Sequence, residues 1–131
     1  MKAAFRYYWP AILWALFILI ICSIKLGKVS ESPLFFPGFD KLVHCGFFFV
    51  MIVFSLTGYI RQQSSGILSY TVVLLITVLI IAYGGIIELL QLYIFTWRSG
   101  EWNDLFADTI GALMGAFSIF ITIKALSYDK K

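Results

Sequence analysis

Four long apolar runs, separated by short polar breaks, dominate the chain. They predict helices over about 9–24, 42–60, 67–95 and 105–126, because a helix needs about 20 mostly apolar residues to cross the hydrocarbon core of a bilayer. At about 1.5 Å per residue the third run exceeds that core, so we expect it to tilt, to protrude or to end early. The pattern predicts an all-α membrane protein, an antiparallel bundle of four transmembrane helices, with residues 1–131 forming one domain.

The breaks between the runs carry their own information. Basic residues flank the first run as in a signal peptide, but no A-x-A cleavage site is present, and we expect an uncleaved first helix with Pro10 in its first turn. The connector before the second run mixes Gly, Pro and Ser with large apolar side chains, which predicts a segment lying flat in the membrane interface.

Composition agrees with a membrane protein. The chain is 61% hydrophobic and 13% charged with a mean hydropathy of +0.93, whereas soluble domains carry roughly 25% charged residues. The net charge of +3 collects at the ends and in the first connector, which is typical of a topology signal and not of a nucleic-acid surface. Cys22 and Cys45 match neither a disulfide framework nor a zinc site; they read as small buried hydrophobes, with pairing near the outer face as the alternative.

The basic residues also predict an orientation. With both termini in the cytoplasm, six Lys and Arg residues fall inside and four fall outside, which agrees with the positive-inside rule. The inner set is Lys2, Arg6, Arg61, Lys124, Lys130 and Lys131, and the outer set is Lys25, Lys28, Lys41 and Arg98.

If the four helices alternate in direction, the ionisable residues gather on one side of the membrane. The predicted orientation makes that side extracytoplasmic. Because charges at or inside the rim of a bilayer are costly, they usually mark a site. Asp40 and His44 are four residues apart, as are Asp104 and Asp108, so each pair shares a helix face. The gathered residues comprise five of the seven acidic residues and the only histidine: Asp40, His44, Glu88, Glu101, Asp104 and Asp108.

Small residues accompany these polar groups. Gly84 and Gly85 lie one turn from Glu88, where a neighbouring helix can approach closely. Gly111 and Gly115 form a G-x-x-x-G pattern on the stripe that carries the second aspartate of the last run. We expect this stripe to pack within the bundle instead of forming a dimer seam.

The order FDKLVH, ELLQ, Arg98 with Ser99, and DLFADTIGALMG resembles the VanZ-like family of small bacterial membrane proteins over roughly residues 39–115. The resemblance implies a multi-pass protein of the bacterial cytoplasmic membrane and a link to resistance to the glycopeptide teicoplanin. Where such proteins commonly carry asparagine before T-I-G, this chain has Asp108. An ionised aspartate can only accept hydrogen bonds, so Asp108 either holds a proton or faces a cation.

The gathered residues carry surplus negative charge. Like carboxylates in a poorly hydrated site cannot all stay ionised, so one or more should hold a proton or share a cation. No motif demands a cofactor, but a divalent cation held by Glu88, Asp104 and Asp108, with His44 beside them, is one way to balance the charge. If His44 is neutral, three negative charges are in excess: Asp40, Glu88, Glu101, Asp104 and Asp108 against Lys41 and Arg98.

Three functions compete at this stage. In the first, the cluster is a structural network in which Arg98 bridges the acids and His44 bonds Asp40 or Glu88. In the second, the protein is an enzyme acting on a lipid-linked precursor, with His44, Glu88 or Asp104 as candidate catalytic groups, although G-x-S-x-G and H-E-x-x-H patterns are absent from the sequence.

The third function is binding or shielding of an envelope lipid, a peptidoglycan precursor or a lipid-tailed glycopeptide. This function matches the resemblance best. The membrane lipids themselves are the other expected partner, and the sequence leaves the oligomeric state open. The candidate binding residues are Asp40, Lys41, His44, Glu88, Gln91, Arg98, Asp104 and Asp108.

Several single residues have simpler interpretations. Lys41 is either a cation reaching the interface or a ligand group. Asp104 is a candidate N-cap of the last helix, and Glu101 is expected to be a solvated loop charge. Trp97 and Trp102 flank the polar loop and are expected to anchor it in the interface.

Overall fold

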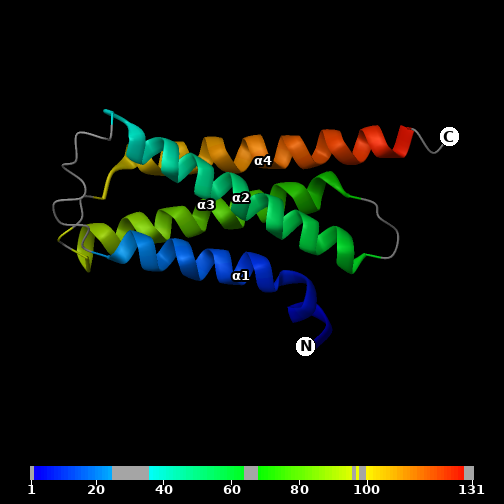
Figure 1. Ribbon diagram of the computed structural model, residues 1–131, viewed down its shortest axis with the longest axis horizontal. Coiled ribbons are helices and arrows are strands. Elements are labelled where there is room, and N and C mark those ends of the chain that lie inside the picture. Colours follow the sequence, from blue (N-terminus) through cyan, green and yellow to red (C-terminus); the bar gives the residue numbers. More distant parts are fainter. Residues whose placement is uncertain (1, 25–35, 64–67, 96, 98–99, 129–131) are drawn as a thin grey trace.

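The computed structural model describes residues 2–24, 36–63, 68–95, 97 and 100–128. Four helices run through these segments, and each is long and apolar enough to cross a membrane. The predicted all-α, four-helix architecture is confirmed. The helices are α1 (Lys2–Ser23), α2 (Phe39–Gln62), α3 (Tyr70–Tyr93) and α4 (Trp102–Tyr128) (Figure 1).

The bounds of α1 and α3 differ from the predicted ones. α1 begins well before residue 9, so Pro10 lies inside the helix and not in its first turn. A proline inside a helix removes a hydrogen bond and bends the axis, and Figure 1 shows α1 bending over its first turns. α3 spans Tyr70–Tyr93, 24 residues, which still exceeds the roughly 30 Å hydrocarbon core at about 1.5 Å per residue, so tilting or protrusion of the third span stays a prediction.

The helices run up and down, with α2 at the centre of the packing. α2 packs most extensively against α4, touches α1 on another side, and shares a smaller contact with α3. α3 also packs against α4, so α2, α3 and α4 surround a common interior, while α1 contacts only α2 and α3 among the described residues. Side chains of α2, α3 and α4 can therefore meet.

The close contact between α2 and α4 depends on the G-x-x-x-G pattern. A Cβ atom added at Gly111 would lie 2.8 Å from the carbonyl carbon of Cys45, and one added at Gly115 would lie 2.8 Å from the carbonyl oxygen of Phe49. Only a residue without a side chain allows such backbone approach. The expected packing of this stripe within the bundle is confirmed.

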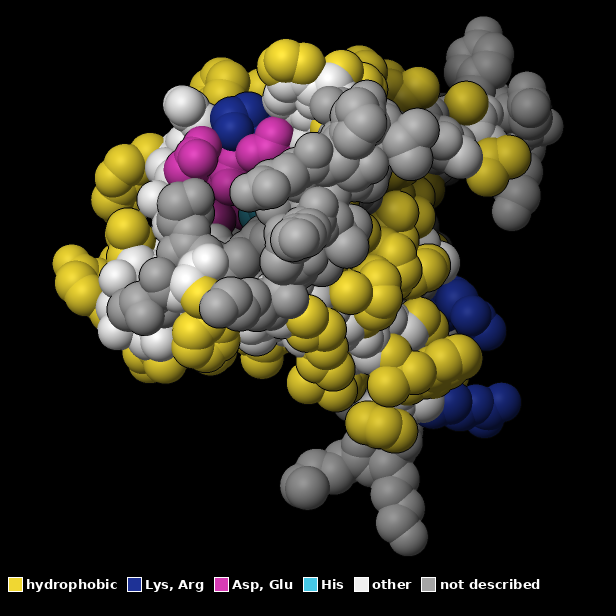
Figure 2. All heavy atoms as spheres, turned by 60° about the vertical axis from the view of Figure 1, so that its left-hand side comes forward, with side chains coloured by type: hydrophobic (Ala, Val, Ile, Leu, Met, Phe, Trp, Pro, Cys, Tyr) yellow, Lys and Arg dark blue, Asp and Glu magenta, His cyan; other side chains and the backbone are white. Residues whose placement is uncertain are grey.

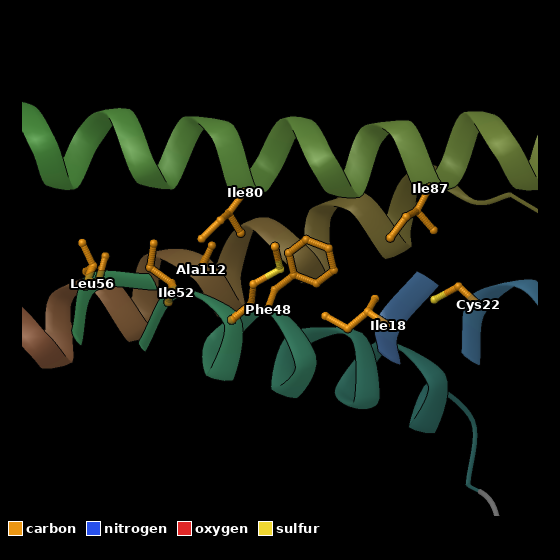
Figure 3. Close-up of a cluster of buried hydrophobic side chains, with 10 residues drawn as sticks. Ile18, Cys22, Phe48, Ile52, Leu56, Ile80, Ile87 and Ala112 are labelled. Carbon is orange, nitrogen blue, oxygen red and sulfur yellow. The ribbon is translucent and has the colours of Figure 1, made fainter. Parts of the chain in front are cut away.

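The core lies between the helices, and the outer faces of the bundle are apolar as well. Figure 3 shows part of the core, in which side chains of α1, α2, α3 and α4 interdigitate. Cys22 is among them, as a small buried hydrophobe, while Cys45 is only partly buried. The described core includes Ile18, Phe48, Ile52, Leu56, Ile80, Ile87 and Ala112. Because large apolar side chains also cover the outside, lipid is the solvent that suits this surface.

Candidate functional site

The left-hand end of the bundle in Figure 1 carries the polar site. α2 and α4 begin there, and α1 and α3 end there. Figure 2 turns this end toward the viewer and shows acidic side chains beside a basic one, within a surround of hydrophobic side chains. Charged groups at the edge of an apolar bundle are costly unless they are paired. The partners of each group therefore determine what the site can do.

The deepest ionisable side chains are His44 of α2, Glu88 of α3 and Asp108 of α4, which we call the inner group. They are 5%, 1% and 1% exposed, respectively. His44 Nδ1 and Asp108 Oδ1 share a hydrogen bond of 3.0 Å. The partner of His44 is thus Asp108 and not the predicted Asp40 or Glu88, because the close approach of α4 to α2 brings Asp108 to the imidazole.

Half of the carboxylate oxygens in the inner group have a partner and half do not. Glu88 Oε2 accepts a hydrogen bond of 2.8 Å from the backbone N–H of Glu101, which ties α3 to the segment entering α4. Glu88 Oε1 and Asp108 Oδ2 are buried and have no hydrogen-bond partner among the described residues. Such oxygens are costly in an apolar interior, so they are a feature that a function has to explain.

Gly84 makes room for the inner group. A Cβ atom at this position would lie 2.8 Å from Asp108 Oδ2 and 3.1 Å from the ring of Phe48. At Gly85 a Cβ atom would meet nothing within 4 Å. The expected close approach of a neighbouring helix is therefore confirmed for Gly84 and wrong for Gly85.

Nearer the end of the bundle lies the outer group, which consists of Lys41, Asp40, Glu101 and Asp104. Lys41 Nζ lies 3.0 Å from Asp40 Oδ2, 3.1 Å from Glu101 Oε2 and 3.4 Å from Asp104 Oδ1. The first two contacts are hydrogen bonds, and the third is a charge contact only. Asp104 also reaches toward the inner group, since its Oδ2 lies 3.9 Å from His44 Nε2.

Two predictions about these residues need correction. Glu101 is not simply a solvated loop charge, because its side chain binds Lys41 and its backbone N–H binds Glu88. Asp104 is not the N-cap, because α4 already begins at Trp102 and Asp104 lies in its first turn. An acidic side chain in a first turn still suits the helix dipole.

Two further candidates, Gln91 and Trp97, make hydrogen bonds to α1. Gln91 is buried and donates to the carbonyl oxygen of Cys22 at 3.0 Å, so its amide links α3 to α1. Trp97 Nε1 donates to the carbonyl oxygen of Ser23 at 3.0 Å, and Trp102 is exposed; interface anchoring by these indoles stays a prediction. Arg98 and Ser99 fall outside the described residues. The candidate metal ligands are divided, since Glu88 and Asp108 belong to the inner group and Asp104 to the outer one.

Beside the outer group, a groove of about 360 Å³ runs along α2 and α4. Its polar end carries Lys41 and Asn103, and the rest of its lining is almost entirely apolar. Sequence reasoning missed this groove, although the spacing of its α4 residues at i, i+3, i+4 and i+7 marks one helix face. The lining residues are Lys41, Cys45, Asn103, Phe106, Ala107 and Ile110.

These features define a multi-pass membrane protein in which three helices bring a polar site together at one end of the bundle. The family model described as VanZ/LLP1 matches residues 4–123. The chain therefore belongs to the VanZ/LLP1 family, as the short motifs indicated. No curated protein and no solved structure matches the chain.

Proposed function

We propose that this protein binds an amphiphile of the bacterial envelope, with the headgroup at the outer group and the apolar part along the groove. The observation that carries this proposal is the groove itself. It opens beside Lys41 and Asn103 and continues over Phe106 and Ile110, so it offers polar contacts at one end and apolar contacts over the rest. A lipid or a lipid-tailed molecule likewise has a polar headgroup at one end and an apolar chain over the rest.

The charges favour a headgroup that contains an amine. The outer group holds three carboxylates, against the single amine of Lys41 among the described residues. Lys41 and Arg98 are the candidate partners of a phosphate or carboxylate on the same molecule. An amine-bearing envelope lipid, a lipid-linked peptidoglycan precursor and a lipid-tailed glycopeptide such as teicoplanin all have this chemistry.

The proposal places the site on the extracytoplasmic side of the cytoplasmic membrane, as the basic residues suggest. Phe36 and Gln63 are exposed at opposite ends of α2, so they offer a matched pair for labelling. In intact cells a membrane-impermeant thiol reagent should label Phe36→Cys above the unsubstituted protein. Gln63→Cys should react only after permeabilisation. The reverse pattern would place the site in the cytoplasm.

Shortening one side chain of the groove should weaken binding. Phe106 and Phe117 both lie on α4 and are 66% and 68% exposed, but only Phe106 lines the groove. We expect Phe106→Ala to weaken binding about tenfold, because losing roughly 50 Å² of apolar contact costs about 1.3 kcal/mol. Phe117→Ala should bind as the wild type does. The measurement is native mass spectrometry of the detergent-purified protein with phosphatidylethanolamine, a lipid-linked precursor or teicoplanin.

The same experiment can contradict the proposal. If none of the three probes binds the wild type above an uncharged lipid such as diacylglycerol, amphiphile binding is wrong. Equal losses in Phe106→Ala and Phe117→Ala would mean that the groove is not the binding surface.

An enzyme acting on a lipid-linked precursor is the second candidate. The hydrogen bond between His44 and Asp108 favours it, because a carboxylate that orients an imidazole prepares it to act as a general base. Release of a new product from the precursor, lost in His44→Gln, would support this candidate.

A structural network is the third alternative. If each substitution in the inner and outer groups lowers the abundance of the protein in the membrane in step with the envelope phenotype, the two groups form such a network.

A further inference from the structure

The inner group is negatively charged without a matching cation. Glu88 and Asp108 are buried next to His44, and even a protonated imidazole offsets only one of the two carboxylates. The amine of Lys41 pairs with Asp40, Glu101 and Asp104 instead. Within the described segments, no lysine or arginine pairs with Glu88 or Asp108. Two buried carboxylates next to a neutral imidazole are balanced by a charge of two.

The unpartnered oxygens are a second, independent sign of a missing partner. Glu88 Oε1 and Asp108 Oδ2 are buried and receive no hydrogen bond from the described residues. The two carboxylates come from different helices, α3 and α4, and the imidazole comes from a third. The bundle therefore brings unsatisfied hydrogen-bond acceptors together in one place, although apolar side chains at these positions would cost less free energy.

We propose that His44, Glu88 and Asp108 bind one divalent cation of the Mn²⁺ or Zn²⁺ class. Carboxylate oxygens suit any divalent ion, but an imidazole nitrogen favours transition metals over Mg²⁺ and Ca²⁺. With neutral His44, two carboxylates and one such ion form a site without net charge. This site does not depend on amphiphile binding in the groove.

The distances suit one shared ion. Two ligands at about 2.1 Å from an ion and at right angles to each other are about 3.0 Å apart, which is the separation of His44 Nδ1 and Asp108 Oδ1. The ligand atoms of all three residues lie within 4.8 Å of one another. Two ligands of a tetrahedral ion are about 3.4 Å apart and opposite ligands of an octahedral ion about 4.2 Å apart, so the side chains have to draw closer together to share one ion.

The outer group is a poorer candidate, although Asp40, Glu101 and Asp104 also lie within 4.8 Å of one another. Its centre is already occupied by the amine of Lys41, which an ion would have to displace. Asp40 and Glu101 are also largely solvent-accessible, with side chains 56% and 43% exposed. Hydrated carboxylates gain less from an ion than buried ones do.

The test is a metal titration of the detergent-purified full chain, prepared without a histidine tag and treated with a chelator. Bound metal is measured by elemental mass spectrometry after desalting. We expect the wild type to retain one Mn²⁺ or Zn²⁺ per chain in the presence of excess Mg²⁺. Glu88→Gln and Asp108→Asn should each weaken binding at least about tenfold, since changes even to groups behind the ligands cost 10-fold to 100-fold. Asp40→Asn, which also removes one carboxylate charge, should stay within about twofold.

A second measurement uses the wild type alone and does not depend on whether a variant folds. Bound Mn²⁺ should show coupling to a ligand nitrogen in its electron paramagnetic resonance spectrum. Because His44 is the only histidine in the chain, this coupling would assign the nitrogen ligand to His44. Failure of the wild type to retain metal, or retention without nitrogen coupling, would overturn the proposal. So would equal binding by Asp40→Asn and properly folded Glu88→Gln. Repeating the amphiphile assay on the chelated protein keeps the two proposals separate.

Discussion

Replacing Gly111 with alanine should destabilise the bundle by about 3 kcal/mol or more, at the upper end of the range for overpacked interiors. The added Cβ would overlap the backbone carbonyl of Cys45 and lie 3.0 Å from its Cα atom. A side chain can rotate away from such a contact, but a helix backbone cannot, so α2 and α4 would have to separate. The measurement is the free energy of unfolding in a titration of mixed micelles with sodium dodecyl sulfate.

Gly46→Ala is the matched control for this change. Gly46 follows Cys45 on α2 but is exposed, and a Cβ atom there would meet nothing within 4 Å. Both substitutions raise helix propensity by a similar amount, so the difference between them isolates the contact with Cys45. Equal stability of the two variants would mean that α2 and α4 do not pack as described.

Replacing Gly84 with alanine should disrupt the inner group. The new methyl group would lie 2.8 Å from Asp108 Oδ2 and 3.1 Å from the ring of Phe48, so the carboxylate of Asp108 has to shift, and we expect this shift to disturb its hydrogen bond with His44. We expect a loss of about 1–3 kcal/mol in stability and at least about tenfold weaker binding of Mn²⁺ or Zn²⁺. Gly85→Ala, one residue further along the same helix, should leave both properties unchanged or slightly raise the stability.

The single histidine gives this prediction a direct readout. In protein labelled with ¹⁵N-histidine and free of a histidine tag, the ring of His44 alone contributes side-chain signals. The Nδ1 signal should shift in Gly84→Ala, because the hydrogen bond to Asp108 Oδ1 is disturbed, and should stay in place in Gly85→Ala. An unchanged Nδ1 signal in Gly84→Ala would contradict the geometry of the inner group.

Local pattern was enough to find the spans and the end of the bundle that carries the site. A run of apolar residues predicts a transmembrane helix because every backbone polar group must be satisfied within the segment. Alternation of the spans then brings Asp40, His44, Glu88 and Asp108 to one side, whatever the details of packing. The motifs around these residues also indicated the family correctly.

Pattern could not assign the partners of those residues. Asp40 and His44 share a helix face, yet Asp40 binds Lys41 while His44 binds Asp108. Glu101 looked like a loop charge because the local pattern reveals neither its side-chain contact with Lys41 of α2 nor its backbone bond to Glu88 of α3. The groove was missed because it needs Lys41 and Cys45 of α2 beside one face of α4.

The sequence by itself determined that this protein has four membrane-spanning helices, a polar end and membership of a known family, because hydropathy, spacing and motifs are local properties of the chain. Tertiary structure alone decided that His44, Glu88 and Asp108 form a buried group, that Lys41 organises a separate outer group, and that a groove lies beside it. The physical reason is that these contacts depend on the rotation and separation of the helices. The close contacts of neighbouring helices at Gly84, Gly111 and Gly115 set the rotation and the separation.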